Sequence, residues 1–255
     1  MAIGWEAWTA GLISLLAGLS TAVGGGIVLV RRRRAGSGPV VFAMGFSAGV
    51  MATVSLADLL PEAAALLRAG GWGLSGLPLA AAGVGMGIAA LLDRLLPEGA
   101  ADSEEDWQAM RVGIFSLLAL LLHNIPEGVA TFMACCSDLS LGIPVAAAIA
   151  LHNIPEGVAI AVPICYGGGG RGRAFGYTLL AGLSEPFGAL LCWLFLRRWM
   201  SDRLLGVTFA LVAGVMLYLA LEELLPTAEE YNRPFCSLAG VLCGCMVMAA
   251  GLLCI

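Results

Sequence analysis

Lysine is absent from this chain, and charge of either sign is scarce. All 13 basic residues are arginine, and only 12% of the 255 residues are charged, whereas 60% are hydrophobic. A soluble domain has about 25% charged and 45–50% apolar residues. One water-soluble core cannot hide this excess, so the composition predicts that lipid surrounds the chain. The net charge is −5, and because charge is scarce and not patterned for nucleic acid, we expect no nucleic-acid partner.

The eight cysteines contain no C-x-x-C pair of the kind that binds structural zinc. Most of them lie in or beside apolar segments. We therefore interpret them as small buried hydrophobic side chains and expect neither a disulfide framework nor a cysteine-based metal site.

The sequence is instead rich in long apolar runs. A membrane helix needs about 20 mainly apolar residues. Eight segments qualify, and short connections join them: residues 5–30, 39–67, 72–96, 110–136, 139–166, 173–199, 204–226 and 234–255. The first run contains Glu6 and lacks a basic leader, so we expect a retained span and not a cleaved signal peptide. The sequence predicts an all-α integral membrane protein with one transmembrane domain over residues 1–255.

Arginine placement indicates the orientation of the chain, because arginine collects in cytoplasmic loops. Nine arginines fall in the odd-to-even connections: Arg31 to Arg34, Arg94, Arg111, Arg171, Arg173 and Arg233. Four fall on the opposite side: Arg68, Arg197, Arg198 and Arg203. We therefore expect a multi-pass protein of the cell (plasma or inner) membrane with both termini extracytoplasmic.

Short matches between the two halves indicate an internal repeat. "LLAGLS" occurs at 15–20 and at 179–184, "AGVM" at 48–51 and 213–216, and "DLLPEA" at 58–63 resembles "ELLPTA" at 223–228. The three matches have the same offset along the chain to within one residue. They relate span 1 to span 6 and span 2 to span 7. No comparable match joins spans 3 and 8. Because the related spans are five apart, the copies run in opposite directions, which predicts an inverted repeat of helices 1–3 and 6–8 around a central helix 4/5 pair.

The motif "HNIPEG" occurs twice, at 123–128 and 152–157, and holds both histidines of the chain. In each copy, His and Glu are four residues apart and Asn and Glu three apart, so all three share one helix face. The proline after each Asn-Ile pair predicts a kink. About ten residues separate each copy from the turn at 137–142, or about 15 Å of helix, which places both copies near mid-membrane. Ionisable groups at that depth suggest function. The candidate metal ligands are His123, Asn124, Glu127, His152, Asn153 and Glu156.

A further acid is found through the repeat. The residue that follows "LLAGLS" is Thr21 in the first copy and Glu185 in the second, so Glu185 is an addition to one half and a candidate ligand. Met51, Asp58, Glu222 and Glu223 are secondary transport-path candidates, although packing or an interfacial position explains each of them as well.

Imidazole with carboxylate suits Zn, Fe, Mn, Co or Ni better than Ca or Mg. A carboxylate between two ligand sets can bridge two cations, so a binuclear site is plausible. An intramembrane metal-dependent enzyme is an alternative, but the H-E-x-x-H order of a protease and the Glu-x-x-His pairs of di-iron proteins are both missing. A passive metal channel also stays open. We expect no enzyme activity and no resident cofactor, because the bound metal is the cargo.

The chain resembles the ZIP (Zrt/Irt-like) family of divalent metal transporters over nearly its whole length. The resemblance lies in "HNIPEGVATF", "ALHNIPEGVAIA", "GLSEPFGALL" and "GFSAGVM…DLLPEA". It implies eight helices and a homodimer. It also implies uptake of zinc, and also of Fe, Mn, Co and Cd, into the cytosol as one helix bundle slides past the other. It also implies one metal held by His123, Glu127, His152 and Glu156, and a second held by Asn124, Asn153 and Glu185 with Glu127 and Glu156 bridging.

Overall fold

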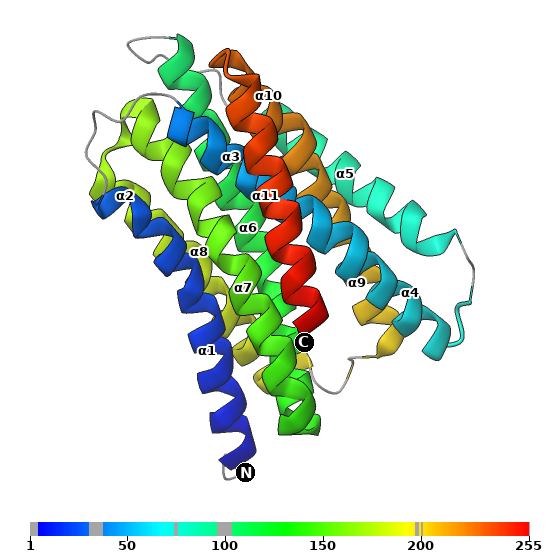
Figure 1. Cartoon of the computed structure of the whole chain (residues 1–255). Helices are drawn as coiled ribbons and strands as arrows, with labels where there is room; N and C mark the ends of the chain where they lie inside the picture. The colour runs from blue at the N-terminus through cyan, green and yellow to red at the C-terminus, as the bar shows by residue number, and fades with distance from the viewer. Residues whose placement is uncertain are drawn as a thin grey trace.

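A computed structural model describes residues 5–30, 38–73, 76–95, 104–196, 199 and 201–254. In this part of the chain the secondary structure is helical (Figure 1). The α-helices are α1 (Trp5–Gly25), α2 (Ile27–Val30), α3 (Gly38–Val54), α4 (Leu60–Ala69), α5 (Leu77–Leu95), α6 (Glu104–Ser137), α7 (Leu139–Ile164), α8 (Arg171–Leu191), α9 (Asp202–Tyr218), α10 (Leu225–Glu230) and α11 (Pro234–Cys254). Four π-helical turns extend or join them at Ser55–Leu59, Cys165–Gly169, Cys192–Leu196 and Leu219–Leu224.

Eight helical stretches of the described residues are long and apolar enough to cross a membrane, which confirms the predicted number. Helices suit this role because they satisfy every backbone polar group internally, as hydrocarbon requires. The stretches are Trp5–Leu29, Gly38–Ala69, Leu77–Leu95, Ala109–Cys136, Gly142–Gly169, Arg171–Phe195, Asp202–Glu230 and Pro234–Leu253.

The third span begins later than the sequence analysis predicted, at Leu77 and not at residue 72. Gly71 has a φ of 85°, which ends the preceding helix in a left-handed residue. Pro78 stands at the second position of α5, where its missing N–H costs nothing. The apolar Trp72 therefore belongs to the connection and not to the helix. Arg31 to Arg34, Arg197 and Arg198, which contributed to the predicted orientation, lie outside the described residues.

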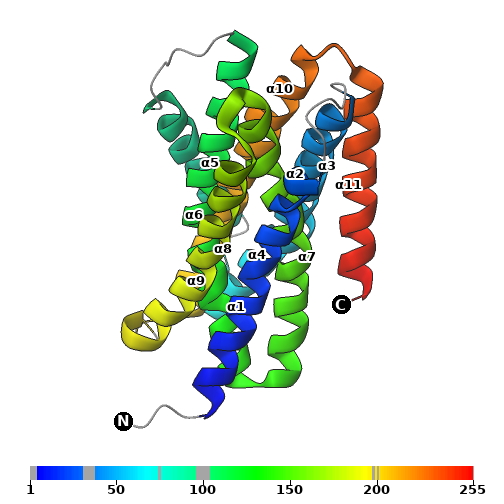
Figure 2. The same ribbon diagram turned by 90° about the vertical axis from the view of Figure 1, so that its left-hand side faces the viewer.

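The helices pack as two groups. In the first bundle, α1 packs on α7 and α8, and α6 packs on the same two helices. In the second bundle, α3 packs on α11, and α9 packs on α4 and α5. The two bundles meet where α3 lies against α7 and where α6 lies against α9. The two views of the ribbon show α7 and α6 in the interior and α5 and α11 at the periphery (Figures 1 and 2).

Glycine allows a close helix crossing between α1 and α8 in the first bundle. A Cβ at Gly18 would meet the carbonyl of Gly182, and a Cβ at Gly182 would meet the carbonyl of Gly18. Both contacts would fall well inside the 3.0 Å that Cβ atoms keep. The two residues occupy the same place in the two "LLAGLS" copies, and α1 and α8 run in opposite directions (Figure 2). Small residues at such crossings let membrane helices approach backbone to backbone.

Further close contacts occur in two copies. Gly24 of α1 lies against the carbonyl of Ile154, and Gly188 of α8 lies against the carbonyl of Ile125. The two glycines are related by the same offset as the "LLAGLS" copies, and the two isoleucines occupy the same place in the two "HNIPEG" copies. The four helices of the first bundle are therefore joined by contacts that repeat along the chain.

The second bundle has paired contacts of the same kind. Gly49 of α3 lies against the carbonyl of Val241 in α11, and Gly214 of α9 lies against the carbonyl of Ala82 in α5. A second pair of contacts is related by the same offsets along the chain. Gly85 lies against the carbonyl of Leu211, and Gly244 lies against the carbonyl of Phe46. No sequence match is evident between α5 and α11, but in these contacts Ala82 and Gly85 of α5 are paired with Val241 and Gly244 of α11 at one constant offset.

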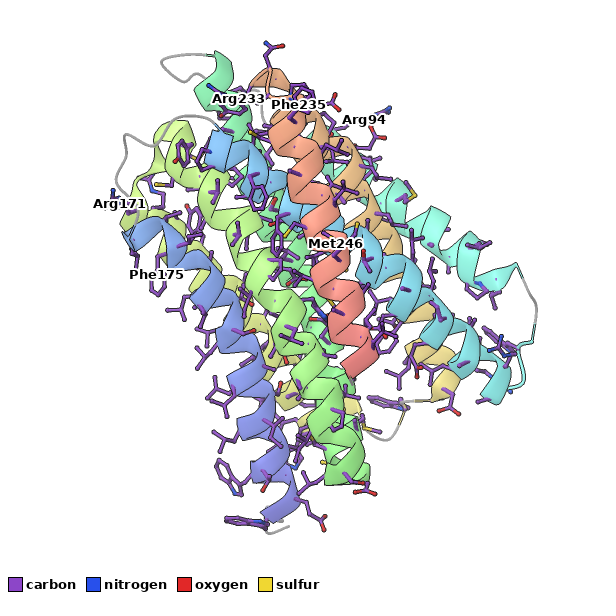
Figure 3. All side chains as sticks on the ribbon, viewed as in Figure 1. Arg94, Arg171, Phe175, Arg233, Phe235 and Met246 are labelled. Atoms are coloured by element: carbon purple, nitrogen blue, oxygen red, sulfur yellow. The ribbon has the colours of Figure 1, made fainter. Side chains whose placement is uncertain are left out.

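Three arginines lie toward one end of the molecule. Arg94, Arg171 and Arg233, which belong to three different connections, lie toward the same end in Figure 3. The first residues of α1 and the last of α11 point away from that end (Figure 1). At the opposite end, the carboxylate of Asp138 accepts a hydrogen bond from the Ser140 N–H and caps α7. Hydrogen bonding from Ser140 lowers the pKa of Asp138.

Candidate metal centre

The two "HNIPEG" copies lie on the packed helices α6 and α7 of the first bundle. Each helix continues on both sides of its proline, Pro126 or Pro155. All seven predicted ligands are buried, with at most 3% of any residue exposed: His123, Asn124, Glu127, His152, Asn153, Glu156 and Glu185. Burial of this many polar side chains costs free energy unless each one finds a partner.

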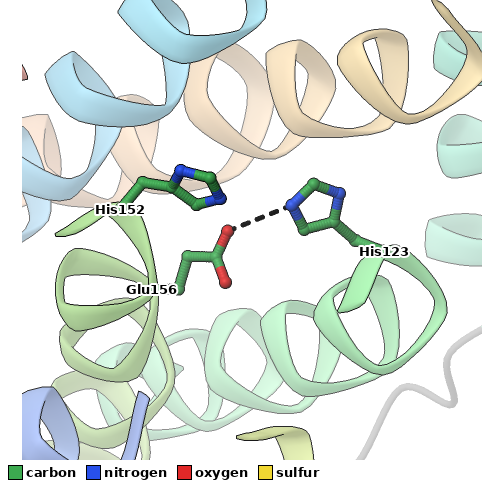
Figure 4. A group of neighbouring side chains, drawn as sticks. All are labelled: His123, His152 and Glu156. Atoms are coloured by element: carbon green, nitrogen blue, oxygen red, sulfur yellow. Dashed lines mark ion pairs between the residues drawn. The ribbon is translucent and has the colours of Figure 1, made fainter. Parts of the chain in front are cut away.

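Four of these side chains converge from the two helices. The Nε2 atom of His152 forms a 2.6 Å hydrogen bond with Oε1 of Glu127. The same carboxylate oxygen lies 3.0 Å from Nε2 of His123, which is also 3.2 Å from Oε1 of Glu156. Figure 4 shows His152 and Glu156 facing His123 across the gap between the helices. The copies therefore join their ligands crosswise, since each histidine of one helix meets a glutamate of the other.

The geometry of this cluster suits a cation. The ligand atoms of His123, His152 and Glu156 all lie within 4.8 Å of one another. Nε2 of His123 is close to two carboxylates but makes no hydrogen bond of good geometry. Imidazole nitrogen and carboxylate oxygen are a donor set that zinc and similar divalent ions bind.

The two asparagines anchor the motif helices to the helices that flank them. Nδ2 of Asn153 donates to the carbonyl of Ala17 in α1, and Nδ2 of Asn124 donates to the carbonyl of Ala181 in α8, both at 3.1 Å. Nδ2 of Asn153 also donates to Oε2 of Glu185 at 2.9 Å. The structure thus brings Glu185 into contact with Asn153, a contact that no spacing along the chain indicates.

Several oxygen atoms around the cluster have no hydrogen-bond partner among the described residues. They are Oδ1 of Asn124 and Asn153, Oε1 of Glu185, Oε2 of Glu127 and both oxygens of Glu156. An unpaired buried acceptor costs about 1–3 kcal/mol, so a group of them is stable when a cation or ordered water accepts their lone pairs. These oxygens belong to the residues that the family resemblance implies for a second metal and for the bridging carboxylates.

The secondary candidates make none of these hydrogen bonds or ion pairs, although Asp58 interacts electrostatically with His152 and Glu127. Met51 in α3 and its counterpart Met216 in α9 are both buried in the apolar core. Asp58 is half-buried and Glu222 is exposed. Asp58 lies in the π-helical turn Ser55–Leu59 and Glu222 in the turn Leu219–Leu224. Each turn precedes a proline, whose missing N–H releases the carbonyl four residues earlier.

Sequence reasoning missed a polar cluster around Arg111. Its guanidinium lies 2.5 Å from Oδ1 of Asp93 and 3.8 Å from Oε1 of Glu223, which is buried. The hydroxyl of Tyr218 donates to Oδ2 of Asp93 at 3.2 Å. Arg111 belongs to α6 of the first bundle. Asp93 belongs to α5, Tyr218 to α9 and Glu223 to the π-helical turn after α9, so the ion pairs join the bundles. No signal in the sequence marks it, because these residues are far apart along the chain.

A second polar link between the bundles lies beside the metal-binding motif. The hydroxyl of Ser47 in α3 donates to the carbonyl of Pro155 in α7 at 2.8 Å, and Ser47 is fully buried. Ser47 directly precedes the first "AGVM" copy, and the residue that precedes the second copy is Val212, whose side chain has no donor. The second "AGVM" copy therefore offers no equivalent hydroxyl donor.

Comparison with known proteins identifies the family. The family model described as ZIP Zinc transporter matches residues 97–251. The zinc transporter ZupT of Corynebacterium aurimucosum is 41% identical over 93% of this chain and 94% of its own length. ZupT proteins of Chlorobium phaeovibrioides and Streptococcus mutans are each 39% identical, over 95% and 96% of this chain and 96% and 97% of their own lengths. The chain therefore belongs to the ZIP family of multi-span membrane proteins, which are transporters and not enzymes.

Proposed function

We propose that this protein carries divalent metal ions, zinc foremost, across the cell membrane into the cytosol through the cluster on α6, α7 and α8. The single observation that carries the proposal is the crosswise convergence of His123, Glu127, His152 and Glu156, buried between two helices of membrane-spanning length. Zinc is the leading substrate because the donor set suits it and because the relatives above are named zinc transporters.

In this proposal, the side chains of the cluster replace the water molecules that surround the ion in solution. Two imidazoles and two carboxylates would hold the first ion, with the carboxylates of Glu127 and Glu156 shared by a second. Asn124, Asn153 and Glu185 would complete the second set, since their oxygens are buried and unpaired. The amides are neutral, so they supply ligands without adding negative charge. This limits the affinity, and an ion must leave the site as readily as it enters.

The paired glycine contacts support an inverted repeat as the framework for alternating access. Contacts that recur at constant offsets, on helices that run in opposite directions, are what two related halves would make. The motif helices lie between those halves, so the same cluster would face first one side of the membrane and then the other. With Arg94, Arg171 and Arg233 at the cytoplasmic end, both termini would be extracytoplasmic. The family resemblance further implies a homodimer.

Asp58, Glu223 and Glu222 are proposed as secondary positions on the transport path. Asp58 and Glu223 correspond in the repeat and occupy matching π-helical turns. In the proposed orientation Asp58 lies on the extracytoplasmic half of its helix and Glu223 on the cytoplasmic half. Met51 is buried in the same helix as Asp58 and would line the path between it and the cluster.

Metal uptake into proteoliposomes tests the proposal. We compare the wild type with Glu156→Gln, which keeps the size of the side chain and removes its charge, for Zn, Cd, Mn, Fe and Co. Glu62→Gln, at an exposed position of α4, is the matched control for loss of one acid. We expect saturable zinc uptake in the wild type and the control and its loss in Glu156→Gln. Normal uptake by a folded Glu156→Gln protein would refute the assignment of the site, and flux that never saturates would indicate a channel.

A further inference from the structure

The contacts that hold α1 and α8 against the motif helices reveal which of their residues correspond. A Cβ at Gly157, just after Glu156, would meet the carbonyl of Thr21 in α1. A Cβ at Gly128, just after Glu127, would meet the carbonyl of Glu185 in α8. The two glycines end the two "HNIPEG" copies, and their partners each follow one of the two "LLAGLS" copies. The two contacts are therefore counterparts, like the other paired contacts of this bundle.

The asparagines follow the same rule. Asn153 donates to Ala17 and Asn124 to Ala181, and these two alanines occupy the same place in the two "LLAGLS" copies. Thr21 and Glu185 each lie four residues after the carbonyl that accepts this bond. Thr21 is therefore placed relative to Asn124 as Glu185 is placed relative to Asn153.

Among these contacts, one hydrogen bond of Glu185 has no counterpart at Thr21. Oε2 of Glu185 accepts a hydrogen bond from Asn153 at 2.9 Å. The hydroxyl of Thr21 has no hydrogen-bond partner among the described residues although Thr21 is fully buried, and Oδ1 of Asn124 has none either. A threonine hydroxyl is bonded directly to Cβ, whereas a glutamate carboxylate is two carbons farther away. Thr21 therefore cannot reach as far as Glu185 does.

We propose that Thr21 and Asn124 form a neutral half-site, the counterpart of the Glu185–Asn153 half-site, which binds water and keeps the metal centre at three carboxylates. The proposal rests on the transport function proposed above. Buried hydroxyl and amide oxygens without protein partners are where ordered water binds. The water would fill the place that the longer glutamate side chain occupies in the other half.

The charge of the site explains why a hydroxyl stands at this position. Glu127, Glu156 and Glu185 would offer three carboxylates to the ions in a buried space where electrostatic interactions are strong. A fourth carboxylate would bind divalent ions more tightly and slow their release. Thr21 is thus a specificity-determining position that sets the number of charges facing the ions.

Exchanging the two residues tests the inference. Zinc bound per purified chain is measured by elemental analysis and titration calorimetry, and uptake is measured in proteoliposomes. We expect Glu185→Thr to lose bound zinc and the double variant Thr21→Glu, Glu185→Thr to regain it, because the carboxylate then faces Asn124. The double variant Thr21→Gln, Glu185→Thr has the same size without the charge and should not regain zinc.

The outcomes separate this inference from the function on which it depends. If Glu185→Thr binds and transports zinc like the wild type, the proposed role of Glu185 is wrong. If Glu185→Thr loses zinc and the folded exchange variant fails to regain it, Thr21 does not correspond to Glu185 and the half-site proposal is overturned. Restoration by the exchange variant but not by the glutamine variant supports it.

A conservative pair decides the question if the exchange variant does not fold. Thr21→Val keeps the shape and removes the hydroxyl, whereas Thr21→Ser keeps the hydroxyl. We expect Thr21→Val to transport zinc about fivefold more slowly, the equivalent of one hydrogen bond's net contribution, and Thr21→Ser to stay within about twofold of the wild type. Equal rates for valine, serine and the wild type would overturn the proposal.

Discussion

Gly128→Ala should move the metal ligands of α6 and α8 apart without removing any of them. Gly128 directly follows Glu127, and its missing Cβ leaves room for the carbonyl of Glu185 in α8. An added methyl group would fall well inside the 3.0 Å that Cβ atoms keep, and its obstacle is backbone, which cannot rotate away. Helices α6 and α8 would have to separate at the level of the two carboxylates.

The size of the effect follows from that displacement. A separation of roughly 1 Å between ligands that must act together can lower a rate by about 100-fold. The strain of overpacking costs about 1–3 kcal/mol. We therefore expect Gly128→Ala to reach the membrane and fold with a lower thermal midpoint, and to transport zinc at about 1–10% of the wild-type rate.

Gly176→Ala is the matched control. Gly176 lies on α8, where an added Cβ would meet nothing within 4 Å, and alanine favours a helix by about 0.5–1 kcal/mol over glycine. Thermal melts in detergent and zinc uptake in proteoliposomes are measured for both variants. Wild-type uptake and stability in Gly128→Ala would refute the argument that this backbone contact positions the ligands.

Three other changes test contacts away from the metal centre. Ser47→Ala should cost about 1 kcal/mol of stability, because it removes the bond to Pro155, whereas Ser55→Ala should cost less, since that hydroxyl bonds its own helix; equal midpoints would contradict this. Arg111→Gln should lower the stability by about 1 kcal/mol, discounted for its exposure, and an unchanged melt would show that the ion pair does not hold the bundles together. Asp138→Ala should lower the midpoint at pH 7, and because the folded carboxyl has a lowered pKa, the difference from the wild type should vanish as the pH falls through that pKa, which melts from neutral to acidic pH measure.

The spans and the motif were readable from the sequence because each depends on local chemistry. Apolar length alone indicates a membrane helix, and all eight spans are confirmed. The misplaced boundary at Leu77 lies in a glycine-rich connection whose Trp72 is as apolar as a helix residue. Spacing also showed that His123 and Glu127 share a helix face.

The paired backbone contacts of α5 and α11 could not be predicted from the sequence. Their corresponding contacts are made by the backbone, as with the carbonyls of Ala82 and Val241. A backbone contact leaves the side chain free to vary, so the sequences of the two helices can differ while their positions agree. Only the packed structure reveals such a correspondence.

By itself, the sequence determined that this chain is a membrane protein with eight membrane-spanning helices, and that two copies of one motif hold its only imidazoles. Only the tertiary structure decided that each histidine meets the glutamate of the other helix, that Glu185 bonds Asn153, and that the buried Thr21 hydroxyl has no partner among the described residues. The physical reason is that helix formation and burial in lipid depend on neighbouring residues, whereas the partner of a polar side chain depends on how helices from distant parts of the chain cross.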